Sequence, residues 1–133
     1  MTALEAGIVT ADGVALATFY VAGLGFRIDR VLDFDEGTVH RLSADQARLK
    51  IFQPSDGAAS PEPATPWHRD SGFAYASLHV ADIGVAVTRA TGGGATVLTP
   101  PTQHRPGANF AMIADPEGNV WELLEEPRPT EGL

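Results

Sequence analysis

The chain has 133 residues, of which 44% are hydrophobic and 20% charged, a size and composition typical of one compact domain. A net charge of −8 opposes binding to nucleic acid or to an anionic membrane surface, and the lack of cysteine excludes disulfides, thiolate metal sites and a cysteine nucleophile. No apolar run approaches the roughly 18 residues of a membrane helix, so we expect a soluble, cytoplasmic protein.

The first half of the chain predicts a strand, a helix and three further strands. Every second residue in 4–10 is apolar, as a half-buried strand requires. Asp12 stands where a carboxylate N-cap begins a helix, and Gly23 stands where that helix is expected to end. The three strands that follow are expected at 26–32, 37–42 and 48–52.

A stretch rich in proline, glycine and small polar residues, 54–72, predicts a linker. The order of elements then repeats, with a strand at 73–80, a helix that begins after Asp82 and ends at 92–94, and three strands. These strands are expected at 96–98, 109–114 and 120–124. The turn 115–119 has proline and glycine at turn positions and predicts a hairpin between the last two strands.

The two halves form a weak internal repeat. Asp12 falls on Asp82 at a spacing of 70 residues, and Lys50 falls on Glu122 at a spacing of 72. We therefore expect an α+β fold of two βαβββ modules, the first over about 1–53 and the second over about 73–127. The remaining residues, 128–133, are expected to form a tail.

The segments FYVAGLGF (19–26) and IADPEGNVWELLE (113–125), one in each half, resemble the vicinal oxygen chelate superfamily of glyoxalases, bleomycin-resistance proteins and extradiol dioxygenases. The resemblance covers nearly the whole chain. It implies a single domain in which the two modules form a partial barrel of mixed sheet around a shared cavity. It does not imply one reaction, because this fold supports many functions.

The resemblance also implies four metal-ligand positions, usually His or Gln seven residues before each capping aspartate and Glu on the last strand of each module. Glu5, Lys50, Tyr75 and Glu122 occupy these positions, and only Glu122 is the usual ligand. A protonated lysine repels a divalent cation, and a neutral phenol is a poor ligand. We therefore predict no cofactor. Glu5, Lys50 and Glu122 have two interpretations, an internal ion-pair cluster in the metal's place or solvated charges on a rim.

Alternation along the strands places further side chains on the same faces as these four residues. Ser77 and His79 share a face with Tyr75, and Phe52 shares a face with Lys50. His79 and Glu122 are the candidate catalytic bases, with hydrogen-bonded pocket walls as the alternative interpretation. Two other candidates lie in expected loops, where they could close over a bound ligand: Trp67 in the linker and His104 in 100–106. The alternative for His104 is an ordinary exposed loop residue. Trp67 is instead expected to pack on the cavity mouth or on a second subunit.

These residues favour a metal-independent protein that binds a small organic molecule in the cavity between the modules, for sequestration or modest acid–base chemistry. Whether it is an enzyme is left open. The alternative is a metal-dependent lyase, isomerase or dioxygenase of the same superfamily, in which a divalent ion is held by Glu122 with Glu5, or by Glu122 with His79 and another histidine. Sequence motifs for phosphate loops and for a hydrolase nucleophile are absent. Open sheet edges predict a homodimer.

Overall fold

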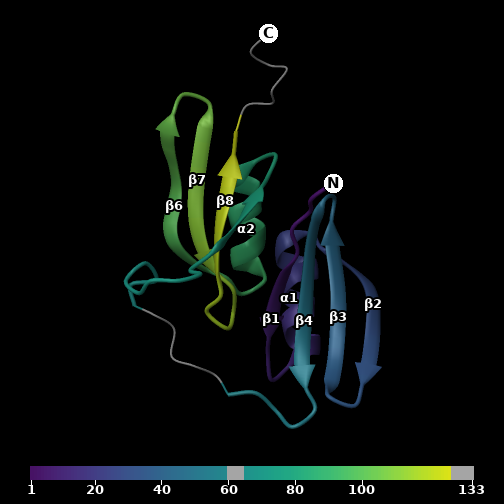
Figure 1. The fold of residues 1–133 in the computed structure, drawn as a ribbon. Coiled ribbons are helices and arrows are strands. Elements are labelled where there is room, and N and C mark those ends of the chain that lie inside the picture. Colours follow the sequence, from purple (N-terminus) through teal and green to yellow (C-terminus); the bar gives the residue numbers. More distant parts are fainter. Residues whose placement is uncertain (60–64, 127–133) are drawn as a thin grey trace. The chain divides into compact units, whose positions relative to one another are not determined.

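The computed structural model describes residues 1–59 and 65–126, which divide into two compact units, 1–62 and 63–133. Each unit contains one four-stranded mixed sheet and one helix (Figure 1). The predicted α+β class and the two βαβββ modules are confirmed. We refer to the units as module 1 and module 2 and describe each by itself.

Module 1 has the predicted order of strand, helix and three strands. Its elements are β1 (Ala6–Val9), α1 (Gly13–Leu24), β2 (Arg27–Phe34), β3 (Gly37–Ala44) and β4 (Ala47–Pro54). The sheet order is β1-β4-β3-β2, with β1 parallel to β4 and the other pairs antiparallel. The helix α1 packs against β2, β3 and β4 and covers one face of the sheet (Figure 1). The opposite face is called the open face below.

Module 2 repeats this topology. Its elements are β5 (Ala76–His79), α2 (Ile83–Gly92), β6 (Thr96–Arg105), β7 (Ala108–Ala114) and β8 (Val120–Glu125). The sheet order is β5-β8-β7-β6, again with only the first pair parallel. The helix α2 packs against β6, β7 and β8. Module 2 therefore has its own open face, on the side of the sheet away from α2.

Alternating apolar residues build the helix-covered face of each sheet. In module 1, Leu16 and Tyr20 of α1 are buried with Leu42, Leu49 and Ile51 of the sheet. Leu16 and Tyr20 are four residues apart, so they lie on the same side of the helix. The neighbours of Leu49 and Ile51 along β4 point to the open face instead.

Both helices begin with the same pair of side-chain hydrogen bonds. Asp12 and Asp82 each accept from the backbone amide three residues later at 3.0 Å, which confirms the predicted N-caps. The first helical amide donates to a side chain of the last strand, Gln53 in module 1 at 2.7 Å and Glu125 in module 2 at 2.8 Å. The two modules, which are related by a weak sequence repeat, thus share the same hydrogen bonds at the start of the helix.

Several element boundaries differ from the prediction. The strands β1 and β5 are shorter than predicted, since Leu4 and Phe73 are exposed and lie outside the ladders. Gly23 does not end α1, because the helix continues to Leu24. Gly25 ends it in a left-handed conformation with φ of 76°, and its amide donates back to the Tyr20 carbonyl.

The strand β6 is longer than predicted and includes most of the expected loop at 100–106. Pro100 and Pro101 fit because β6 is the edge strand, where a missing N–H costs no ladder hydrogen bond on its outer side. The register of β6 against β7 shifts between Thr99 and Thr102, next to these prolines. The loop prediction was therefore wrong for His104, which lies in the strand.

The predicted hairpin between β7 and β8 is confirmed. Asp115 is buried, and its Oδ1 accepts from the amides of Glu117 and Asn119 at 2.9 Å each. Gly118 has φ of 91°, a conformation that glycine adopts without strain. The side chain of Asp115 thus satisfies two backbone amides of the turn.

The linker expected at 54–72 begins at residue 55 in the structure, because Pro54 is the last residue of β4. Residues 60–64 of that linker, residue 127 of module 2 and the expected tail 128–133 lie outside the described residues. Among residues 1–59 and 65–126, neither helix has the length and apolar character needed to cross a membrane.

Candidate functional site

Two of the four family metal positions lie together in module 1. Glu5 directly precedes β1, and Lys50 lies on the open face of β4, with its Nζ 3.1 Å from Glu5 Oε1. The predicted ion pair between these residues is present. The Lys50 side chain is 49% exposed and the Glu5 side chain 28% exposed, so the pair is only partly removed from water.

The backbone explains why Lys50 reaches Glu5. The residue directly opposite Lys50 on β1 is Gly7, which has no side chain to interact with the ammonium group. The extended lysine side chain therefore meets the next polar residue on this face, two positions before Gly7.

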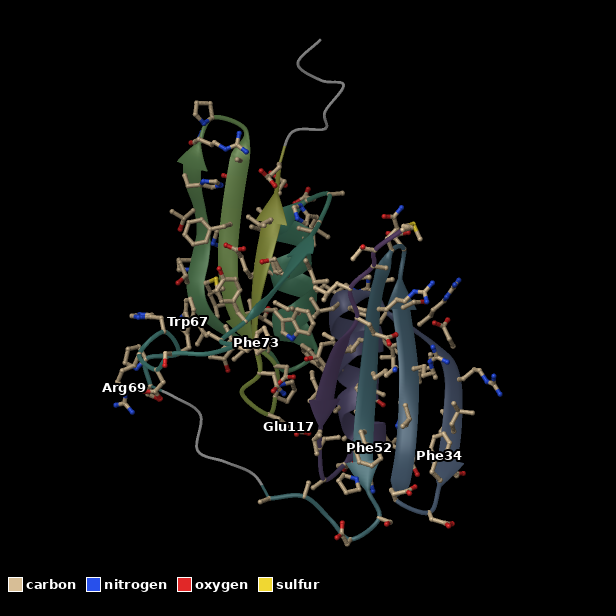
Figure 2. All side chains as sticks on the ribbon, viewed as in Figure 1. Phe34, Phe52, Trp67, Arg69, Phe73 and Glu117 are labelled. Carbon is tan, nitrogen blue, oxygen red and sulfur yellow. The ribbon has the colours of Figure 1, made fainter. Side chains whose placement is uncertain are left out.

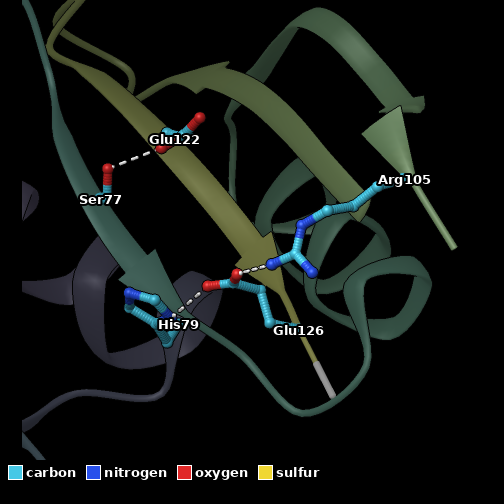
Figure 3. A network of polar contacts seen from close by, with 5 residues as sticks. All are labelled: Ser77, His79, Arg105, Glu122 and Glu126. Carbon is cyan, nitrogen blue, oxygen red and sulfur yellow. Dashed lines mark hydrogen bonds and ion pairs between the residues drawn. The ribbon is translucent and has the colours of Figure 1, made fainter. Parts of the chain in front are cut away.

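The other two expected metal positions lie in module 2, where the contacts differ. Glu122 on β8 lies directly opposite Ser77 on β5, and Ser77 Oγ donates to Glu122 Oε1 at 2.7 Å (Figure 3). Tyr75 contacts the Trp67 ring instead, with ring centroids 5.4 Å apart and an interplanar angle of 83°. Glu122 is thus hydrogen-bonded within its own module. The predicted contact of Glu122 with Lys50 stays a prediction.

Trp67 lies on the segment that leads into β5 (Figure 2). Its half-buried ring makes edge-to-face contacts with both Tyr75 and His68. Edge-to-face geometry is favourable for aromatic pairs. Trp67 therefore packs on Tyr75, one of the four expected metal positions, and its packing on a cavity mouth or a second subunit stays a prediction.

His79, a candidate base, belongs to a second polar network in module 2 (Figure 3). Its Nδ1 lies 3.5 Å from Glu126 Oε1, and the other oxygen of Glu126 accepts from Arg105 Nη2 at 2.6 Å. The His79 side chain is 70% exposed. A carboxylate that faces one ring nitrogen orients the imidazole, which leaves the other nitrogen for proton transfer.

Glu126 and Arg105 were missed by the sequence reasoning. Glu126 is two residues beyond Leu124, which pairs with His79, so strand alternation places it on the face that His79 shares. That signal was present in the sequence. Arg105 could not be found in this way, because residues 100–106 were expected to form a loop and not the end of β6.

The remaining two candidates lie apart from these polar contacts. His104 on β6 contacts the Phe110 ring, with centroids 5.9 Å apart. Phe52 is half-buried on the open face of module 1, opposite Val39 on β3 and Val9 on β1. Phe52 and Phe34 mark the same end of this sheet (Figure 2).

Comparisons with known proteins decide the family. The sequence model of the Glyoxalase/Bleomycin resistance protein/Dioxygenase superfamily matches residues 3–123. The chain belongs to this superfamily. No functionally curated protein matches the chain.

Solved structures of superfamily proteins share the fold. A glyoxylase/bleomycin resistance protein/dioxygenase domain from Frankia sp. EAN1pec has a TM-score of 0.78 at 14% identity, covering 97% of this chain and 94% of that one. A glyoxalase family protein from Enterococcus faecalis has a TM-score of 0.68 at 21% identity, covering 94% and 96%. A glyoxalase I mutant from Zea mays has a TM-score of 0.76 at 15% identity, covering 96% of this chain and 46% of that one.

The residues at the family metal positions do not fit a divalent ion. Lys50 offers no lone pair while its ammonium group is paired with Glu5, and one oxygen of Glu122 is occupied by Ser77. Two carboxylates alone form an incomplete oxygen shell for a hard cation. Within the parts of the chain that the structure describes, no group of three His, Cys, Asp or Glu side chains is arranged to hold a metal.

Proposed function

We propose that this superfamily member binds a small organic molecule without a metal, on the open sheet faces, for sequestration or modest acid–base chemistry. The observation that carries the proposal is the ion pair of Lys50 with Glu5 at two metal-ligand positions. The Lys50 ammonium opposes a divalent ion, and its N–H groups can donate to an anionic or polar ligand group.

Aromatic and aliphatic surface on both open faces supports an organic ligand. In module 1, Val9 and Phe34 are exposed near the half-buried Phe52. In module 2, Tyr75 is exposed beside Trp67. Ligand pockets combine apolar surface with a few placed polar groups, and each open face supplies side chains of both kinds.

The proposed roles follow from the contacts. His79, oriented by Glu126, and Glu122, held by Ser77, are the candidate proton-transfer groups. The other proposed ligand contacts are made by residues that share the open faces or border them: Glu5, Lys50, Phe52, Trp67, Tyr75, Ser77 and His104. A modest acid–base reaction requires only His79 or Glu122, and sequestration requires neither.

Metal analysis of protein purified without chelator tests the proposal directly. We expect substoichiometric Ni, Zn, Mn and Fe, and no thermal shift when each ion is added. As a positive control, the triple variant Glu5→His, Lys50→Glu, Tyr75→His restores a His/Glu ligand set and should bind an ion. Stoichiometric metal in the native protein would overturn the proposal and favour the metal-dependent lyase, isomerase or dioxygenase.

Native mass spectrometry tests the ligand itself. We expect a small organic molecule retained after gentle purification, or recovered by binding from a metabolite mixture, and lost on denaturation. The double variant Phe52→Ala, Tyr75→Ala should reduce retention, whereas the exposed helix variant Val85→Ala should not.

A homodimer is proposed from the open strand edges. Light scattering that returned the monomer mass of 14.0 kDa would contradict it.

A further inference from the structure

The open face of module 1 collects five of the nine basic residues of the chain. Lys50 on β4 lies directly opposite Arg41 on β3, which lies directly opposite Arg30 on β2. Two residues along the strands, Arg48 and Arg27 lie on either side of Ser43. Residues directly opposite in a ladder point to the same face, and like charges there destabilise the pairing. A bound anion would therefore stabilise this arrangement.

The acidic neighbours compensate only part of this positive charge. Arg27 Nε lies 3.0 Å from Asp29 Oδ1, and Lys50 is paired with Glu5. Arg30, Arg41 and Arg48 have no ion pair with any residue in 1–59 or 65–126.

The same arginines line a pocket of about 250 Å³ that belongs entirely to module 1. Its walls hold the four guanidinium groups together with three carboxylates, Glu5, Asp29 and Asp45. Lys50 is paired with Glu5 and Arg27 with Asp29, and the charge of Arg48 also acts on Asp29. Three carboxylates therefore face four guanidinium groups and the Lys50 ammonium. The pocket thus has an excess of positive charge in a protein of net charge −8.

We propose that this pocket, whose lining includes Arg41 and Arg48, binds the oxyanion head of a small organic anion, a carboxylate or a phosphate monoester. The planar guanidinium group presents paired donors that match the two oxygens of such a head. This inference rests on the proposed function and restricts its small organic ligand to one that carries an anionic oxygen head group.

The apolar body of the ligand has a place on the same face. The row next to Arg41 consists of Leu32, Val39 and Phe52, all half-buried. Adjacent rows on one face are two residues apart, about 7 Å along a strand. A head held by Arg41 therefore brings one aromatic ring or a short alkyl chain over Val39 and Phe52.

Competing occupants fit less well. A nucleic acid presents repeated phosphates to the whole surface, and the net charge of −8 repels it beyond this pocket. A metal cation is repelled by the excess of positive charge in the pocket. An internal carboxylate is excluded among the described residues, because the acidic side chains that line the pocket are the three already counted.

Titrations followed by NMR of backbone amides test the proposal with three probes: phenyl phosphate, phenylacetate and the neutral benzyl alcohol. We expect at least one anion to shift amides of β2, β3 and β4 saturably, and benzyl alcohol to bind this pocket at least about tenfold more weakly. Arg41→Gln should weaken the anion by about tenfold or more, since one charge-assisted pair is lost. Arg69→Gln, which removes the same charge from an exposed site in module 2, is the matched control and should have no such effect.

The outcomes separate this inference from the proposed function. Saturable binding that depends on Arg41 and not on Arg69 supports the inference. Equal weakening by both variants shows diffuse charge attraction and overturns it. If neither anion shifts the pocket amides while native mass spectrometry still finds a bound molecule, the inference fails and the proposed function stands. Binding of both anions identifies the shared oxyanion, and a preference for one identifies the head group.

Discussion

The two modules share one backbone design and differ in what each sheet presents on its open face. Lys50 and Glu122 occupy equivalent positions on β4 and β8, and the residues opposite them are Gly7 and Ser77. Lys50 passes the bare glycine and pairs with Glu5, whereas Glu122 accepts from the Ser77 hydroxyl. Strand pairing decides which side chains are neighbours, and the identity of one small residue then decides which polar contact forms.

The helix-facing side shows the opposite behaviour. Asp12 and Asp82 make the same N-cap hydrogen bonds, and Gln53 and Glu125 both accept from the first helical amide. These contacts satisfy helix termini that every βαβββ module exposes. The side that holds the module together is therefore repeated, while the open face is free to differ, as a binding surface requires.

The largest expected effect comes from the shared core. Ile51 and Leu123 occupy equivalent strand positions and are fully buried. Ile51→Ala and Leu123→Ala should each lower the free energy of unfolding by about 2–5 kcal/mol, because each leaves a cavity. Urea titration with far-UV circular dichroism measures both values.

The same titrations test whether the modules fold as a single domain. Both tryptophans, Trp67 and Trp121, lie in module 2, so their fluorescence reports that module alone. We expect Ile51→Ala to move the fluorescence midpoint together with the circular dichroism midpoint. A fluorescence midpoint that stays at the native value would show that the modules unfold independently. The exposed variant Val14→Ala is the control.

The N-caps give a smaller effect that should be equal in the two modules. Asp12→Ala and Asp82→Ala should each cost about 1 kcal/mol, because each leaves one amide of the first helical turn without its side-chain acceptor. Thermal and urea denaturation of both variants measure the difference. The Asn variants, which retain a capping oxygen, should recover most of the loss. A loss of stability in only one of the two Ala variants would show that the two equivalent N-cap hydrogen bonds do not contribute equally to stability.

The ion pair of module 1 should contribute less than a cap. Both side chains of the Lys50–Glu5 pair are partly exposed, so Lys50→Met should change the free energy of unfolding by about 0.2–1 kcal/mol. The difference should shrink at 1 M salt, where exposed pairs are screened. A loss of about 3–5 kcal/mol that persists in salt would instead identify the internal ion-pair cluster, with the carboxylates buried.

Most of the fold could be predicted from the sequence because its signals are local. Alternation located the strands, and Asp12 and Asp82 located the helix starts, since the capping carboxylate stands next to the segment that it begins. The end of β6 could not be predicted locally. Pro100 and Pro101 indicate a loop, and only the position of β6 at the sheet edge makes them compatible with a strand.

The strand positions of the candidate site residues could be predicted better than their contacts. Counting from the capping aspartates selected Glu5 and Tyr75 within the expected strands, and the structure places them directly before β1 and β5. Their partners depend on the register across the sheet, which a single strand does not encode. The basic residues on the open face of module 1 were missed for the same reason. Arg30 and Arg41 are eleven residues apart in sequence and become neighbours only through the β2–β3 pairing.

The smallest expected effect is the titration of Asp29, which a register shift in β2 places beside the arginines of module 1. The Ser43 hydroxyl, with Arg27 and Arg48, holds the pKa of the Asp29 carboxyl below its ordinary value of 3.8. A carboxyl with a lowered folded pKa stabilises the fold above its unfolded pKa, and this contribution is lost as the pH falls through the folded pKa. Ser43→Ala should therefore raise the pKa of Asp29 towards 3.8 and reduce stability at neutral pH but not in strong acid. Carboxyl carbon shifts followed by NMR from pH 2 to pH 6 measure the pKa in both proteins. An unchanged pKa in Ser43→Ala would assign the shift to the arginines alone, and Arg27→Gln should then raise it instead.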